Sequence, residues 1–109
     1  MSVSLDDRQA LVRYLRRYCA GRENRMKQPA LAAALGWDVR YLQDVISAEA
    51  QHNPHIGTGC GTWAGVWWSV DAEDARIARR SLVGRLAPIA ARVRAIDKAW
   101  PGVAQESLL

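Results

Sequence analysis

The fold is decided by the stretch Gln28-Pro29-Ala30-Leu31-Ala32-Ala33-Ala34-Leu35-Gly36-Trp37-Asp38-Val39-Arg40-Tyr41-Leu42-Gln43-Asp44-Val45-Ile46. It predicts two short helices joined by a tight turn. Pro29 suits the first turn of a helix, where a missing N–H costs nothing. Gly36 is expected to end that helix with a positive φ, and Asp38 to cap the next one. This pattern is typical of a helix-turn-helix.

The second predicted helix, residues 38–48, has two distinct faces because successive residues turn by about 100°. Its apolar face is expected to be buried and consists of Val39, Leu42, Val45 and Ile46. Its polar face then points outward, with Arg40, Asp44, Ser47 and Ala48 in the middle and Tyr41 and Gln43 beside them. A helix held in this way can present its outer face to the major groove of DNA.

The flanking segments extend this motif on both sides. A helix is expected over residues 5–19, with Ser4 as its cap, and a polar loop at residues 21–25 connects it to the motif. Residues 51–70 contain no charged side chain, and they predict a β-hairpin with strands at 56–58 and 66–70. Alternation places Val66, Trp68 and Val70 on one face, so we expect the hairpin to pack on the helices through Trp68.

A long helix is predicted to follow from Asp71. Its apolar residues recur at steps of three or four and are Ala75, Ala78, Leu82, Leu86, Ile89, Val93, Ile96 and Trp100. Pro88 is expected to kink this helix or split it. We therefore divide the chain into a domain at residues 1–70, a helix at 71–100 and a flexible tail at 101–109. The coiled-coil spacing favours a homodimer through this helix, and the alternative is a helix that packs back on its own domain.

The order of these elements resembles the winged helix-turn-helix fold, and more narrowly the small winged-helix proteins of phages and prophages. The residues that carry the resemblance are Leu31, Ala32, Leu35, Gly36, Val39, Leu42, Ile46, Ile56, Gly65, Trp67, Trp68 and the helix from Asp71 through Ile96. The resemblance implies a mainly α fold with a small β-hairpin, and sequence-specific binding of double-stranded DNA by a transcriptional regulator. One departure is that the wing tip, residues 59–64, has no Lys or Arg.

Residues at three places are candidates for DNA contact. Arg40 can form a bidentate contact with guanine and Gln43 with adenine, although Arg40 and Asp44 can also be a plain exposed i,i+4 pair. The remaining candidates on or beside the recognition helix are Asp38, Tyr41 and Ser47. Before it, Lys27 and Gln28 can meet a phosphate at a helix start, with charge added by Arg22 and Arg25. Trp63 at the hairpin tip can wedge against DNA sugars, pack on a partner or fold back.

The remaining features exclude more than they assign. A net charge of +4 is a mild bias toward polyanions. The two distant cysteines, the absence of a signal peptide and the absence of a membrane-length apolar run favour a cytoplasmic protein. His52, His55 and Cys60 do not have standard zinc-ligand spacing, so we expect no metal and no cofactor. A Cys60–His55 nucleophile pair would need an orienting third group and a pocket, neither of which is evident, so we expect no catalysis.

Two alternative functions remain open at this level. The first is an excision or replication accessory factor built on the same fold. The second is a winged-helix module for protein–protein interaction, with Trp63 and Trp67 as its contact surface. The uncharged wing tip favours the second alternative.

Overall fold

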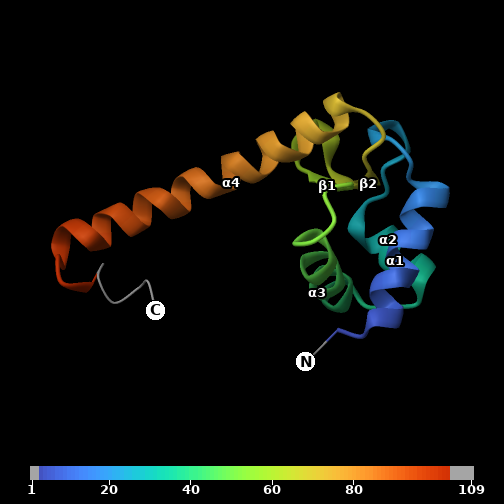
Figure 1. Cartoon of the computed structure of the whole chain (residues 1–109), viewed down its shortest axis with the longest axis horizontal. Coiled ribbons are helices and arrows are strands. Elements are labelled where there is room, and N and C mark those ends of the chain that lie inside the picture. The colour runs from blue at the N-terminus through green and yellow to red at the C-terminus, as the bar shows by residue number, and fades with distance from the viewer. Residues whose placement is uncertain (1–2, 104–109) are drawn as a thin grey trace.

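The computed structural model describes residues 3–103, and these residues contain four α-helices and one antiparallel hairpin (Figure 1). The elements in order are α1 (Leu5–Tyr18), the 3-10 turn η1 (Arg22–Asn24), α2 (Gln28–Leu35), α3 (Val39–Ala50), β1 (Ile56–Gly59), the 3-10 turn η2 (Gly61–Trp63), β2 (Gly65–Trp68) and α4 (Ala72–Ala99). The expectation of a mainly helical fold with a small hairpin and a long C-terminal helix is confirmed.

Local capping chemistry sets the helix boundaries. The Ser4 hydroxyl accepts from the Asp7 N–H at 3.1 Å, and the Asp38 carboxylate accepts from the Tyr41 N–H at 2.7 Å. Gly36 ends α2 with a φ of 75°, in the left-handed region that favours glycine. These three predictions are confirmed, and α1 ends one residue earlier than expected, at Tyr18.

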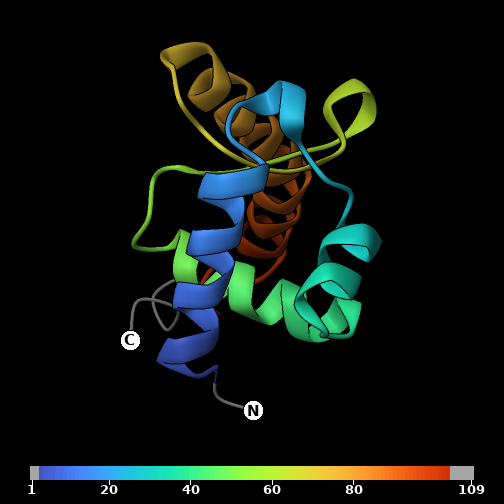
Figure 2. The same cartoon turned by 90° about the vertical axis from the view of Figure 1, so that its right-hand side faces the viewer.

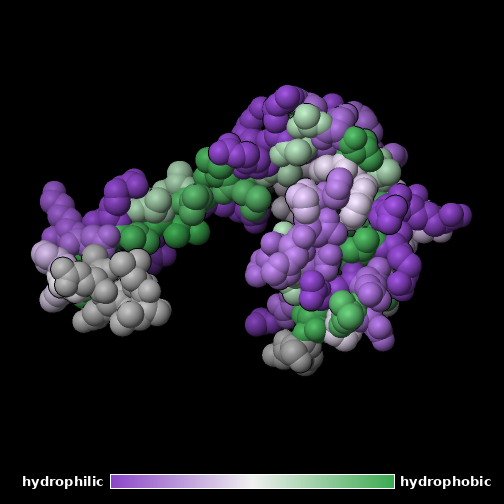
Figure 3. Space-filling model, in the orientation of Figure 1, coloured by the Kyte–Doolittle hydropathy of each residue, from purple (hydrophilic) through white to green (hydrophobic). Residues whose placement is uncertain are grey.

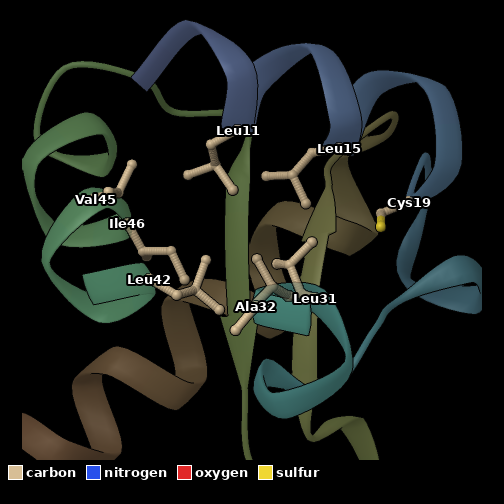
Figure 4. Packing of buried hydrophobic residues seen from close by; sticks show 9 residues of the cluster. Leu11, Leu15, Cys19, Leu31, Ala32, Leu42, Val45 and Ile46 are labelled. Carbon is tan, nitrogen blue, oxygen red and sulfur yellow. The ribbon is translucent and has the colours of Figure 1, made fainter. Parts of the chain in front are cut away.

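The main hydrophobic core lies between α1, α2, α3 and β2 (Figure 4). It consists of Leu11, Leu15, Cys19, Leu31, Ala32, Leu42, Val45, Ile46 and Val66. Three of the four residues expected on the buried face of α3 are therefore in the core. The prediction for Val39 was wrong, because this residue begins the helix and remains 36% exposed.

The second strand of the hairpin is paired along both of its edges. On one edge β2 pairs with β1 in the register Ile56↔Trp68 and Gly59↔Gly65. On the other edge it meets the linker between α1 and α2, where Met26 and Val66 exchange two backbone hydrogen bonds of 3.0 and 2.8 Å. The linker thus bridges this edge at isolated positions without forming a strand, and we did not predict this pairing. The second strand also ends at Trp68, two residues earlier than expected.

Both faces of the hairpin are covered (Figure 2). Val66 and Trp68 pack on the helical core, as predicted. Trp67 points the other way and is fully buried against Ile77 and Ala78 of α4. The prediction that Val70 shares the packed face was wrong: the chain has left the strand there, and Val70 is 61% exposed.

Beyond its first turns, α4 leaves the rest of the fold and extends as a single arm (Figure 1). The helix runs unbroken from Ala72 to Ala99, so the expected split at Pro88 is not found. Of the predicted tail, residues 101–103 form a turn after the helix, and residues 104–109 lie outside the described part of the chain. Within residues 3–103, no helix combines the length and apolarity needed to cross a membrane.

Candidate nucleic-acid interface

The outer surface of α3 is polar and open. Leu42, Val45 and Ile46 anchor the helix in the core. The side chains exposed between these anchors are Arg40, Gln43, Asp44 and Ser47. Their spacing of three and four residues places them on one face of the helix. The residues predicted to read DNA therefore lie together on one accessible surface.

The start of α2 adjoins this surface. The Gln43 side-chain amide donates to the Gln28 side-chain carbonyl at 2.9 Å, which ties the middle of α3 to the first residue of α2. Lys27, the N-cap residue of α2, is exposed and makes no side-chain capping hydrogen bond. The amino end of α2 thus offers a cation and helix N–H groups, the combination that binds a phosphate.

Asp38 and Tyr41 position α3 through hydrogen bonds to other residues of the chain. The carboxylate of Asp38 is engaged in the cap, and the Tyr41 hydroxyl donates to the carboxylate of Asp7 on α1. This hydrogen bond raises the pKa of Tyr41. The Tyr41 ring also meets Trp37 edge-on at a centroid distance of 5.4 Å. Both predicted site residues thus hold α3 in place.

Arg22, Arg25 and Trp63 form a separate cluster at the tip of the hairpin. The guanidinium groups of Arg22 and Arg25 lie over the Trp63 ring, 5.4 and 4.9 Å from its centroid. Arg25 also donates to the Thr62 carbonyl at 3.0 Å. Trp63 is half-buried and packs against the Trp67 cluster. Of the three arrangements considered for Trp63, the structure therefore shows the one in which the side chain folds back onto the protein.

A buried carboxylate holds this cluster to α4. Asp74 is 1% exposed and accepts from Arg22 Nη1 at 2.7 Å and from the Val70 N–H at 2.9 Å. Burial alone would raise the pKa of Asp74, but these hydrogen bonds outweigh it and lower the pKa below its ordinary value. The hydrogen bond between Arg22 and Asp74 also raises the pKa of Arg22. This pair is a structural clamp between the linker and α4.

A groove of about 660 Å³ lies between α3 and α4 and is also lined by residues of β1. We call it the α3–α4 groove. Its lining includes Gln28, Gln43, Ile46, Ser47, Ala50, Gln51, Ile56, Ala78, Arg79, Leu82 and Arg85. Arg79 and Arg85 therefore lie across the groove from the polar face of α3. The sequence did not single them out, because their position depends on how α4 docks on the hairpin.

The potential metal-binding and nucleophilic side chains are dispersed. Cys19 is buried, which raises the pKa of its thiol. The His55 ring stacks on Trp68 at 4.8 Å, and Cys60 lies 3.5 Å from the Ser81 hydroxyl. Within the described residues, no three His, Cys, Asp or Glu side chains gather as a metal-binding group.

Comparisons of the chain with protein-family models, with curated proteins and with solved structures find no match. The candidate interface is thus defined by the arrangement of this chain's own residues. Its centre is the exposed face of α3, and its edges are the amino end of α2 and the α3–α4 groove.

Proposed function

We propose that this protein is a winged helix-turn-helix regulator that binds double-stranded DNA through α3, of the type found in phages and mobile elements. The observation that carries the proposal is the pairing of a buried apolar face on α3 with an exposed polar face that begins at Arg40. The hairpin, together with the linker that bridges its outer edge, supports the winged arrangement.

Each exposed group has a specific role in this proposal. Arg40 contacts guanine in the major groove through its two terminal nitrogens, and Gln43 contacts adenine while its partner Gln28 orients it. Lys27 and the amino end of α2 hold a phosphate. The wing tip lacks basic residues, so Arg79 and Arg85 of α4, which line the groove beside α3, supply additional positive charge.

The proposal is tested by selecting bound duplexes from a random pool and then measuring the affinity of variants for the selected duplex. Arg40→Ala should weaken binding by roughly 5- to 150-fold, which corresponds to the loss of about 1–3 kcal/mol for a bidentate base contact. Arg13→Ala is the matched control, because Arg13 is also an exposed arginine but lies on α1. Equal affinity of the two variants for every duplex would contradict the proposal.

We also propose that the protein forms a homodimer through α4. A row of six large apolar residues lies on one side of the arm, and each is between 49% and 67% exposed. These residues, which we call the α4 seam, are Leu82, Leu86, Ile89, Val93, Ile96 and Trp100. Their alternating steps of four and three define a heptad pattern, which supports a coiled-coil pairing. Sedimentation of the full chain at micromolar concentration tests this, and a monomer there contradicts it.

A further inference from the structure

The α4 seam runs directly into the α3–α4 groove. Leu82, the first seam residue, is part of the groove lining together with Ile46, Ala50 and Ile56. Figure 3 shows green, hydrophobic atoms along α4 from the body of the protein toward the far end of the helix. The seam and the groove therefore form one continuous surface in the angle between α4 and α3.

We propose that a second copy of this chain covers that surface with its own α4 running antiparallel, so that Trp100 of each copy enters the α3–α4 groove of the other. This inference rests on the proposed dimer and specifies its geometry. In the register that matches the two seams, Leu82 faces Trp100 of the partner, Leu86 faces Ile96, and Ile89 faces Val93.

The position of the groove selects the antiparallel orientation. At Leu82 the seam side of α4 already faces α3 and β1 across the groove. In a parallel pair, the domains that precede α4 in the two copies would lie at the same end of the paired helices and on the side of the seam. The partner's α3 and β1 would then occupy the same space as α3 and β1 of the first copy. An antiparallel partner places its body at the opposite end of the pair. Only its helix end then reaches the groove.

Trp100 is the residue best suited to fill the groove. It is the most exposed large apolar residue among those described, at 67%, and it lies at the C-cap of α4. The groove offers apolar side chains such as Ile46 and Ile56, with Ser47 and Gln51 beside them as acceptors for an indole N–H. Arg40 and Asp44 are not part of the groove lining, whereas Gln28, Gln43 and Ser47 are. The partner therefore leaves Arg40 free and lies beside the rest of the polar face of α3.

Flanking charges make the two orientations respond oppositely to one substitution. In the antiparallel register the midpoint of the seam is residue 91, so Arg92 lies close to Arg92 of the partner and repels it. In a parallel pair, Arg92 would instead lie beside Asp97 of the partner, because positions five residues apart on either side of the seam face each other in parallel coiled coils. Arg92→Ala should therefore tighten an antiparallel dimer and weaken a parallel one.

Spin-label distances in the full chain test the orientation. In a Cys60→Ser background, where the remaining Cys19 is buried, a label is placed at Arg76→Cys or at Arg94→Cys; both positions are exposed. With 1.5 Å per residue, the antiparallel pair separates two labels at position 76 by about 45 Å along the axis and two at position 94 by about 9 Å. A parallel pair gives no axial separation at either position.

A long distance at position 76 with a short one at position 94 supports the proposal, and short distances at both positions overturn it. Trp100→Ala should then weaken dimerisation at least tenfold, whereas Val70→Ala, which removes an exposed apolar side chain away from the seam, should leave it unchanged. Equal dimerisation of the two variants also overturns the proposal. Because these measurements are made without DNA, they fail or succeed independently of DNA binding by α3.

Discussion

Arg22 and Asp74 are separated by 52 residues in the chain, yet the Arg22 guanidinium lies 2.7 Å from the Asp74 carboxylate. Arg22 belongs to the linker that pairs with β2, and Asp74 belongs to the first turn of α4. Their ion pair, together with Trp67 packed on Ile77, fixes the direction in which the arm leaves the hairpin. The same contact thereby sets the angle between α4 and the candidate recognition helix.

Replacing the buried carboxylate should destabilise the fold. Asp74→Asn keeps the shape of the side chain but leaves Arg22 with only the more distant and exposed carboxylate of Asp71, at 3.7 Å. Breaking a buried ion pair costs about 3 kcal/mol in the free energy of unfolding. Glu73→Gln is the matched control. It lies on the same helix turn and breaks only the exposed pair with Arg76, which is worth less than about 1 kcal/mol. Urea unfolding of both variants measures the difference, and equal losses would rule out the clamp.

The contribution of Asp74 should also depend on pH. Its pKa is lower in the folded protein than in the unfolded chain, so the unfolded chain binds a proton more readily. The stabilisation by Asp74 is therefore fully present above the unfolded pKa of about 4 and is lost as the pH falls through the folded pKa. The difference in unfolding free energy between the native protein and Asp74→Asn should shrink on acidification below pH ~4. A difference that stays constant over this range would contradict the assignment.

Features that depend on neighbouring residues in the chain were predictable from the sequence. The caps by Ser4 and Asp38 and the left-handed Gly36 require only a few adjacent residues, and all three were found. The exposed face of α3 followed from helical periodicity.

Features that depend on contacts between distant segments were not predictable in this way. From the sequence, Arg22 was interpreted as a cation in a loop, whereas the structure pairs it with Asp74 of α4. Trp63 is half-buried because it packs on a cluster that includes residues of α4, and the linker bridges arise only from contact with β2. A proline normally interrupts a helix, but Pro88 lies where α4 is exposed and unbroken.

Two glycine substitutions should change stability in opposite directions. A Cβ on Gly57 would overlap the Trp67 indole at Nε1 inside the fold, so Gly57→Ala must displace a fully buried ring. We expect a loss of about 1–3 kcal/mol, as for other overpacked sites. Gly84 lies in the exposed part of α4, where an added methyl group meets no atom within 4 Å beyond its chain neighbours and the adjacent backbone of the helix. Gly84→Ala should therefore stabilise the helix by about 0.5–1 kcal/mol. Thermal unfolding distinguishes these signs, and a neutral Gly57→Ala would contradict the packing.

Lys27 and Arg40 should affect DNA binding in different ways. Lys27→Ala should weaken binding to all duplexes by a similar factor and reduce the slope of log K against log salt by about 0.9, the value for one phosphate contact. Arg40→Ala should lower affinity most for the selected sequence, because it removes a base contact. Titrations of a selected and a scrambled duplex at several salt concentrations separate the two effects. Sequence-dependent loss with Lys27→Ala would contradict its assignment to phosphate.

Disrupting the α4 seam should separate dimerisation from DNA contact. Leu86→Glu places a charge in the middle of the apolar row and should make the protein a monomer. Ala91→Glu, an equally charged change at an exposed position off the seam, should leave the dimer intact. Because a symmetric dimer presents two recognition helices to two half-sites, Leu86→Glu should lose affinity for a two-site duplex but bind a single half-site like the native chain. Equal weakening on both duplexes would instead mean that the substitution disturbs α3 itself.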